Sequence, residues 1–207
     1  MNPQLAQARA PRPLPAEGPA SRPPASPAAA PAPAPDAIEV RDAKLSGVKL
    51  IRPATVFEDH RGSYVETWNR DAYRAAGIDV EFVQDDISTS TRNVLRGIHG
   101  DASTWKLISC LHGKFYLVVV NWDPRSPQYR RWEGFTLSDR NRLQVLVPPR
   151  FGNGHVVLSE EAIFHYKQST YYDRAGQFTI LWDDPDLGIW WPIESPILSR
   201  RDQGREG

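Results

Sequence analysis

The segment NVLRGIHGD, residues 93–101, places an arginine and a histidine on either side of a glycine. Arg96 carries a permanent positive charge, and His99 belongs to the side-chain type that gains or loses a proton most readily near neutral pH. Together they offer a base beside a cation that can bind an anion. A lone histidine in a strand is also a common structural residue, so this segment by itself leaves both interpretations open.

Other kinds of catalytic site have little support in the sequence. The five histidines include no His-x-His pair, and the segment PPRFGNGHVV around His155 has no partner motif, so we expect no metal ion. Neither Gly-x-Ser-x-Gly nor Gly-x-x-x-x-Gly-Lys occurs. Cys110, the single cysteine, lies in the apolar run LISCLHG and is interpreted as a buried strand residue. What remains is acid–base chemistry by His, Tyr, Asp and Lys side chains beside arginines.

The composition limits the partners and the compartment that we expect. In 207 residues, 25 basic side chains balance 25 acidic ones, which gives no reason to expect a nucleic-acid or membrane surface. No run approaches the roughly 18 apolar residues of a membrane helix. A single cysteine excludes an internal disulfide and suits a reducing compartment, so we expect a cytoplasmic protein.

Two regions differ in composition. Residues 1–36 carry most of the 19 prolines and predict an extended, disordered tail, whereas residues 37–207 predict one β-rich domain. Three segments each predict two strands meeting at a turn: KLISCLHGKFYLVVVNWD, FTLSDRNRLQVLVPP, and AIFHYKQSTYYD with QFTILWDD. The only helix that we expect is short, around 70–76. Many closely spaced antiparallel strands indicate a sandwich or barrel, and the jelly roll is a main member of that class.

Several blocks, in order along the chain, resemble the dTDP-4-dehydrorhamnose 3,5-epimerase family. They are FEDHRGSYVETWN, FVQDDISTS, NVLRGIHG, the segment from SPQYRRWEGF to QSTYYD, ILWDDPDLGIWWP and SPILSRRD, within residues 46–203. The resemblance implies an all-β, cupin-type double-stranded β-helix, or jelly roll. It further implies a homodimer that acts without a metal or cofactor on a nucleotide diphosphate sugar with a ketone at C4.

The same resemblance assigns a role to individual residues. A histidine base has an acidic partner, a tyrosine returns a proton from the opposite side, and cationic side chains surround the sugar and its oxyanion. The implied catalytic residues are His99, Tyr166, Asp202 and Lys106. The implied substrate-binding residues are Arg61, Glu66, Gln84, Arg96 and Asn153.

The chemistry of these residue types agrees with that assignment. A C4 ketone acidifies the hydrogens on C3 and C5, because removing either gives an enolate. His99 can take such a proton near neutral pH, and Lys106 or Arg96 can stabilise the enolate oxygen. Tyr166 is of a type that is normally protonated, with a pKa of about 10, and can donate to the other face.

The sequence also departs from the family pattern. RGIHGDASTWKL is about three residues shorter than usual before the lysine, and RFGNGHVV places Asn153 where a histidine is usual and His155 where an aromatic residue is usual. These changes resemble a branch that acts on GDP-linked 4-keto heptoses, so the sugar and the base stay open. Two alternative functions also stay open: a 3,4-ketoisomerase of the same barrel class, and a non-catalytic sugar-nucleotide-binding barrel.

Strand geometry adds one structural prediction. Regular alternation would place Arg96 and His99 on opposite faces of a strand, because they are three residues apart. Gly97 lies between them and permits a bulge that re-aims one side chain. We therefore predict irregular strand pairing at Gly97.

Overall fold

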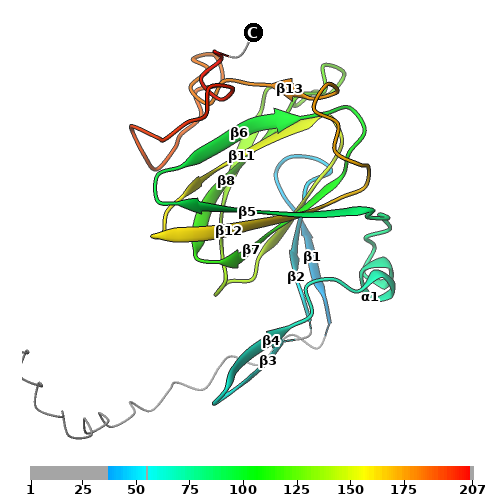
Figure 1. The fold of residues 1–207 in the computed structure, drawn as a ribbon. Coiled ribbons are helices and arrows are strands. Elements are labelled where there is room, and N and C mark those ends of the chain that lie inside the picture. The colour runs from blue at the N-terminus through cyan, green and yellow to red at the C-terminus, as the bar shows by residue number, and fades with distance from the viewer. Residues whose placement is uncertain (1–36, 55, 206–207) are drawn as a thin grey trace, which may run out of the picture. The chain divides into compact units, whose positions relative to one another are not determined.

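The structure, a computed structural model, describes residues 37–54 and 56–205, so the predicted tail at 1–36 lies outside the described residues. Two sheets make up most of the domain (Figure 1). The larger sheet has the order β1 (Glu39–Asp42), β2 (Lys49–Arg52), β10 (Gln144–Val147), β7 (Lys106–His112), β12 (Glu161–Gln168) and β5 (Gln84–Thr91). The smaller sheet has the order β13 (Phe178–Thr179), β6 (Leu95–Gly100), β11 (Phe151–Val157), β8 (Lys114–Asn121) and β9 (Trp132–Ser138).

Strands that follow one another in sequence often belong to different sheets. The three predicted strand pairs all exist as strands, but β7 and β8, β9 and β10, and β12 and β13 do not pair with each other. The expectation of local hairpins was therefore wrong, because each turn carries the chain across from one sheet to the other. Within the sheets, all pairings between strands of distant sequence are antiparallel. This is the topology of a jelly roll and confirms the predicted cupin-type fold class.

Apolar side chains from both sheets fill one end of the space between them. The six-stranded sheet contributes Ile108 and Phe164, and the five-stranded sheet contributes Phe115 and Leu117, each at most 5% exposed. Because side chains alternate along a strand, the next inward-facing positions continue the same wall. On β12 and β7 these next positions are polar, namely Tyr166 and Lys106. The other end of the barrel is therefore lined by polar groups.

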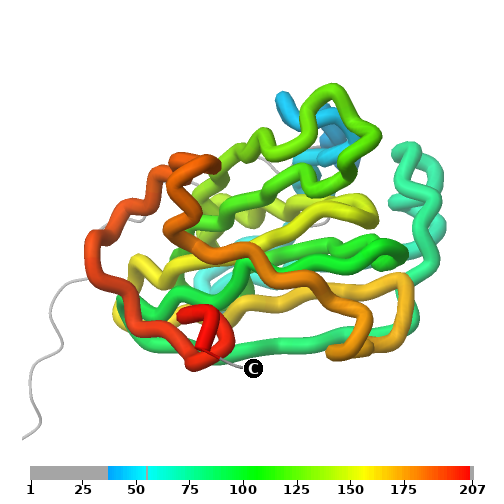
Figure 2. Tube along the Cα trace, turned by 90° about the horizontal axis from the view of Figure 1, so that it is seen from above, coloured from blue at the N-terminus to red at the C-terminus, as the bar shows by residue number. Residues whose placement is uncertain are grey.

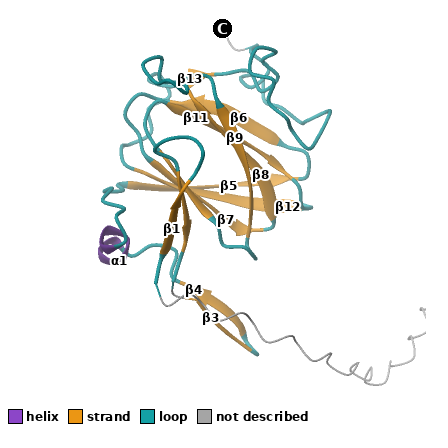
Figure 3. Ribbon diagram, turned by 180° about the vertical axis from the view of Figure 1, so that it is seen from behind, coloured by secondary structure: helices purple, strands orange, loops and turns teal. Residues whose placement is uncertain are grey.

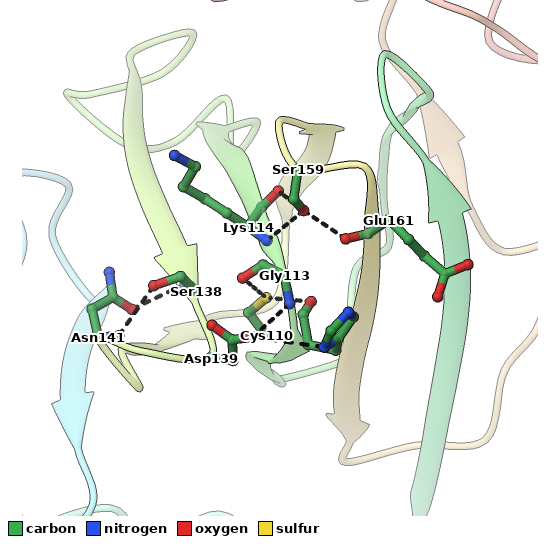
Figure 4. A network of polar contacts seen from close by, with 9 residues as sticks. Cys110, Gly113, Lys114, Ser138, Asp139, Asn141, Ser159 and Glu161 are labelled. Carbon is green, nitrogen blue, oxygen red and sulfur yellow. Dashed lines mark hydrogen bonds and ion pairs between the residues drawn. The ribbon is translucent and has the colours of Figure 1, made fainter. Parts of the chain in front are cut away.

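Hydrogen bonds connect the short turns at the apolar end (Figure 4). The Gly113 amide donates to Asp139 Oδ2 over 2.9 Å, and the Lys114 amide donates to Ser159 Oγ over 2.8 Å. Cys110 is buried here, with its Sγ 3.1 Å from the carbonyl oxygen of His112. Burial, followed by the negative charge of Asp139, raises the pKa of the thiol to about 12. This confirms the interpretation of Cys110 as a buried strand residue, since a thiol that keeps its proton is a poor nucleophile.

One short helix covers part of the outer face of the larger sheet. Helix α1 spans Arg70–Ala75, in agreement with the prediction, and is the only helix drawn in the described part of the chain (Figure 3). Its N-cap residue Asn69 accepts a hydrogen bond from the Ala72 amide over 3.2 Å, which satisfies a donor at the helix start. Tyr73 on its inner side is 1% exposed and packs against this sheet face. No helix among the described residues is long and apolar enough to cross a membrane.

Two further segments extend from the barrel. Strands β3 (Val56–Asp59) and β4 (Gly62–Val65) form a separate two-stranded sheet (Figure 1). The C-terminal segment, orange to red in Figure 2, returns to the smaller sheet. There the Leu95 amide donates to the Ile197 carbonyl over 3.0 Å, and the Ile197 amide donates to the Asn93 carbonyl over 2.9 Å. These bonds hold the last residues of the described chain beside β6.

Candidate active site

A cavity of about 460 Å³ lies between the two sheets at their polar end. Most of the residues that the sequence predicted for the site line it, and they come from both sheets and from the C-terminal segment. They are His99, Tyr166, Asp202, Lys106, Gln84, Arg96 and Asn153. Arg61 and Glu66 are not among its lining residues.

A bulge in β6 brings Arg96 and His99 to the same cavity. Arg96 pairs with His155 of β11 and His99 pairs with Asn153, so β6 has one residue more than β11 between these two pairs. Gly97 adopts a φ of 104°, and a Cβ atom there would lie 2.6 Å from the Asn153 carbonyl oxygen. Only glycine fits both conditions. The predicted irregular pairing at Gly97 is thus confirmed.

His99 has a carboxylate beside its ring. Its Nε2 lies 2.9 Å from Asp202 Oδ1, in a close polar contact whose geometry is not that of a regular hydrogen bond. Asp202 is 4% exposed and also accepts hydrogen bonds from the Gly97 amide at 3.3 Å and from Ser199 Oγ at 2.8 Å. Burial raises the pKa of Asp202, but the contacts with His99, Ser199 and Gly97 outweigh it and hold that pKa below its ordinary value. An ionised carboxylate at Nε2 favours the proton there and leaves the lone pair on Nδ1.

Tyr166 stands on the opposite wall, because it belongs to β12 of the larger sheet whereas His99 belongs to β6 of the smaller one. Burial raises the pKa of Tyr166 to about 12, with smaller contributions from Asp86 and Tyr172. Asp86 is its partner across the β5–β12 pairing. A phenol with such a pKa keeps its proton at neutral pH and can serve as a proton donor.

Lys106 of the larger sheet and Asn153 of the smaller sheet contact each other in the cavity. Lys106 Nζ donates to Asn153 Oδ1 over 3.4 Å, and the lysine is 6% exposed. Burial lowers the pKa of Lys106 and the charge of Arg201 lowers it further, whereas Asp101 opposes the shift. Because a nearby anion stabilises the ammonium form, a negatively charged ligand in the cavity would oppose this lowering of the pKa of Lys106.

Several other polar side chains of the cavity, from both sheets, are held by hydrogen bonds. Arg96 Nε donates to Ser90 Oγ over 2.9 Å, which directs the arginine towards β5. Asp86 Oδ2 accepts from Gln84 Nε2 at 2.7 Å and from Gln168 Nε2 at 2.9 Å. These bonds hold the amide and carboxylate groups of this wall in position before any ligand binds.

Other cavity residues had no predicted role. They are Asp86, His155, Gln168, Tyr172, Gln177 and Arg201, together with Ser88, Phe164 and Ser199. Alternation along the strands carried a signal for some of them, because Asp86 and Gln168 have the same parity as Gln84 and Tyr166. Arg201 directly precedes Asp202 and donates to Gln177 Oε1 over 3.1 Å. His155 stood out in the sequence only as a departure from the family pattern.

Arg61 lies on the turn of the β3–β4 hairpin, away from the cavity lining. Its side chain is 80% exposed, and its guanidinium is paired with Asp59 of the same hairpin, with Nη2 2.7 Å from Oδ2. Glu66 follows the hairpin and is half-buried. Within one chain, the described residues therefore do not bring these two side chains to the other site residues.

The fold and the site define a class of protein: a jelly-roll barrel that encloses a polar cavity, with a histidine beside a carboxylate on one wall and a protonated tyrosine on the other. No group of three or more His, Cys, Asp or Glu side chains among residues 37–54 and 56–205 is arranged to hold a metal ion. The family model described as dTDP-4-dehydrorhamnose 3,5-epimerase matches residues 42–206. The chain belongs to this family.

Known relatives agree with this membership. The dTDP-4-dehydrorhamnose 3,5-epimerase of Shigella flexneri is 40% identical over 157 residues, which are 74% of this chain and 87% of the relative. A dTDP-4-dehydrorhamnose 3-epimerase of Streptomyces niveus is 35% identical over 173 residues, covering 80% of this chain and 82% of the relative. The crystal structure of a dTDP-6-deoxy-D-glucose-3,5-epimerase from Legionella pneumophila, in complex with dTDP-4-keto-L-rhamnose, matches with a TM-score of 0.76 and 34% identity. That match covers 81% of this chain and 90% of the other.

The family fixes the class of reaction. The protein is an isomerase of the nucleotide-sugar epimerase type, in a family that serves deoxysugar biosynthesis. This membership weighs against the alternative of a non-catalytic binding barrel. Which sugar and which carbons are involved depends on the cavity of this chain.

Proposed function

We propose that the protein inverts C3 and C5 of a nucleotide diphosphate 4-keto sugar, with His99 as the base and Tyr166 as the acid. The observation that carries this proposal is their placement on opposite walls of one cavity. Inversion of a carbon requires a proton to leave from one face and another to arrive on the other face. A base and an acid on the same wall would return the proton to the face that it left.

The proposed step conserves protons and charge. Nδ1 of His99 removes the hydrogen from C3 or C5, and the electrons of the broken C–H bond form an enolate whose negative charge rests on the C4 oxygen. Tyr166 then gives its proton to the same carbon from the opposite face, which leaves a phenolate and an imidazolium. Exchange with water returns both side chains to their starting states.

The enolate oxygen needs positive charge that is already in place. Lys106 and Asn153 form the polar contact in the cavity that fits this role, since an ammonium group and an amide N–H can both donate to an oxyanion. Burial makes the ammonium form of Lys106 costly in the free enzyme, so its interaction with a developing anion is strengthened in the same low-dielectric surroundings. Asp202 holds the His99 ring and stabilises its imidazolium form.

The nucleotide diphosphate is assigned to the cationic and amide groups around the sugar. Arg96 suits the diphosphate because a guanidinium binds phosphate oxygens in a bidentate manner, and Gln84 also lines the cavity. Arg61 and Glu66 are assigned to the same ligand, although they do not line the cavity of their own chain.

A homodimer reconciles these two residues with the site. The β3–β4 hairpin exposes Phe57 and Tyr64 at 67% and 63%, and strand β5 exposes Ile87 at 63%. Large apolar side chains exposed in this way are typical of surfaces that contact another protein. We assign the hairpin to the nucleotide site of a second copy of the chain, which would place Arg61 against the partner's ligand.

The identity of the sugar is proposed from the departures in the sequence. The stretch RGIHGD and the segment around Asn153 favour a GDP-linked 4-keto heptose over a dTDP-linked 6-deoxyhexose. Action at both carbons is favoured because the base and the acid are both present, whereas the relative from Streptomyces niveus is named for one carbon.

Incubation with a 4-keto nucleotide sugar in deuterated water tests the proposal. We expect deuterium at C3 and C5 by NMR, with the carbonyl retained at C4. Label at one carbon would reduce the proposal to a single-site epimerase, and a 3-keto product would favour the ketoisomerase. Absence of label from both GDP- and dTDP-linked substrates would refute it.

A further inference from the structure

His155 is a buried histidine in the wall of the cavity with no assigned role. It belongs to β11, is 3% exposed, and lines the cavity together with Phe164. Its ring lies parallel to the ring of Phe164, with centroids 4.1 Å apart and an interplanar angle of 6°. On another side it contacts Phe115, at a centroid distance of 5.2 Å. Aromatic neighbours thus hold the plane of the imidazole.

The polar edge of this ring is left unsatisfied by the described part of the chain. Its Nε2 is buried and has no hydrogen-bond partner among the described residues. Burial, followed by the charge of Arg96, lowers the pKa of His155 to about 3, so the ring is neutral and has one donor and one acceptor nitrogen.

An unpaired buried nitrogen is a feature that most folded proteins avoid, because it loses its bonds to water and gains none in return. A phenylalanine would fill the same aromatic stack without that cost. Because His155 lines the cavity, a ligand there can supply the missing partner. A sugar hydroxyl is such a partner, since it both donates and accepts.

The position of His155 relative to Asn153 indicates which part of the sugar is involved. Both residues lie on β11, which pairs regularly with β8, and both line the cavity. Two residues along a strand span about 6.6 Å. In the proposed pose, the C4 oxygen contacts Lys106 and Asn153. A ligand group that reaches His155 from there must then be attached to a ring carbon next to C4. C5 is one such carbon, and it bears the exocyclic chain of the sugar.

We propose that His155 is a specificity residue that binds a hydroxyl on the exocyclic carbon chain, so that the enzyme prefers 4-keto sugars hydroxylated there over 6-deoxy sugars. The inference rests on the proposed function and deepens it. The ring hydroxyl at C2 is common to both kinds of sugar, so a contact with it would not distinguish them. The 6-deoxyhexose of the Legionella pneumophila relative has only a methyl group as its exocyclic carbon.

The test compares two ligands that differ by one hydroxyl. dTDP-4-keto-glucose and dTDP-4-keto-6-deoxyglucose are titrated calorimetrically into the His99→Ala protein, which cannot turn them over, and the matching GDP-linked pair is measured in the same way. The same titrations are repeated with His155→Phe and His155→Asn added. Phe preserves the aromatic stack and Asn preserves a polar group, so one of the two variants remains informative if the other fails to fold. His165→Phe is the matched control, because its imidazole is also partly buried but does not line the cavity.

We expect the 6-hydroxy ligand to bind roughly ten- to a hundred-fold tighter than the 6-deoxy ligand when His155 is present. His155→Phe should remove most of this ratio by weakening the 6-hydroxy ligand alone, whereas His165→Phe should preserve it. An equal ratio with and without the His155→Phe substitution overturns the inference while leaving the epimerase proposal in place. Failure of every pair to bind overturns both.

Discussion

The cavity and the β3–β4 hairpin both carry residues that the sequence predicted for the site, yet they differ in how those residues are held. In the cavity, Asp202 is 4% exposed and contacts both His99 and the Gly97 amide, which belong to a strand far away in the sequence. On the hairpin, Arg61 is 80% exposed in its side chain and contacts Asp59, two residues away.

Under the proposed function, one chain would hold the acid–base groups but only part of the ligand contacts. Long-range strand pairing and the returning C-terminal segment assemble the acid–base groups within a single barrel. The hairpin exposes aromatic side chains, and its arginine is paired only with Asp59 of the same hairpin. The proposal therefore places proton transfer in one chain and part of the nucleotide binding on its partner.

Removing the base should produce the largest effect. We expect His99→Ala to lower kcat by roughly a hundred- to ten-thousand-fold, because no other described side chain contacting Asp202 can accept the substrate proton. His112→Ala is the matched control, since this histidine lies on a turn at the apolar end with a side chain 60% exposed. Turnover measured by NMR should be unchanged in the control. Comparable losses in both variants would contradict the assignment of the base.

Mixed dimers test the division between the two regions. Arg61→Ala should raise KM roughly ten- to a hundred-fold with little change in kcat, because it removes a charge-assisted contact to phosphate. Co-expression of His99→Ala and Arg61→Ala chains with different tags isolates mixed dimers, in which one cavity has both its own His99 and the partner's Arg61. At substrate concentrations below the raised KM, we expect about half of wild-type activity from this mixed dimer, because one of its two cavities is intact.

The control for this experiment combines two defects that both belong to the cavity. Mixed dimers of His99→Ala and Tyr166→Phe chains have one damaged group in each site, so their epimerase activity should not recover. Recovery there, or no recovery with Arg61→Ala, would show that the hairpin does not serve the partner's site.

The cavity and the hairpin should also differ in how their carboxylates affect stability in acid, although this effect is smaller than those on activity. The folded-state pKa of Asp202 is lowered, so its ionised form stabilises the protein above the unfolded value of about 3.9, and this contribution is lost as the pH falls towards the folded value. Asp202→Asn should therefore flatten the fall in unfolding free energy between about pH 5 and pH 3, measured by urea denaturation. Asp59→Asn on the hairpin should leave that slope unchanged, because an exposed ion pair contributes little. Equal slopes in wild type and Asp202→Asn would contradict the structural role of this carboxylate.

Much of the barrel was predictable from local patterns. Runs such as KFYLVVVN specify strands, the stretch around 70–76 specified the short helix, and Gly97 between Arg96 and His99 specified the bulge. The strand partners were not predictable in this way, since a turn at Gly113 is compatible with both a hairpin and a crossing between sheets. Only the packing of the two sheets against each other decides between them.

The site was predictable where a motif carried it and less so where tertiary contacts define it. His99 and Asp202 were found from matching blocks, although they lie far apart along the chain and only the folded C-terminal segment brings them together. The sequence marked His155 as a departure without a role, because its missing hydrogen-bond partner is visible only in the packed structure. Arg61 matched a motif, but the fold of one chain leaves it outside the cavity.

The central claim is that the base and the acid act from opposite walls, and Tyr166→Phe tests it most directly. This variant is incubated with the substrate in deuterated water, and NMR follows label at C3 and C5 separately from inversion. We predict that deuterium still enters through His99, from the face where the proton left, while inverted product falls by roughly a hundred-fold or more. Loss of deuterium exchange in Tyr166→Phe together with its retention in His99→Ala would contradict the account.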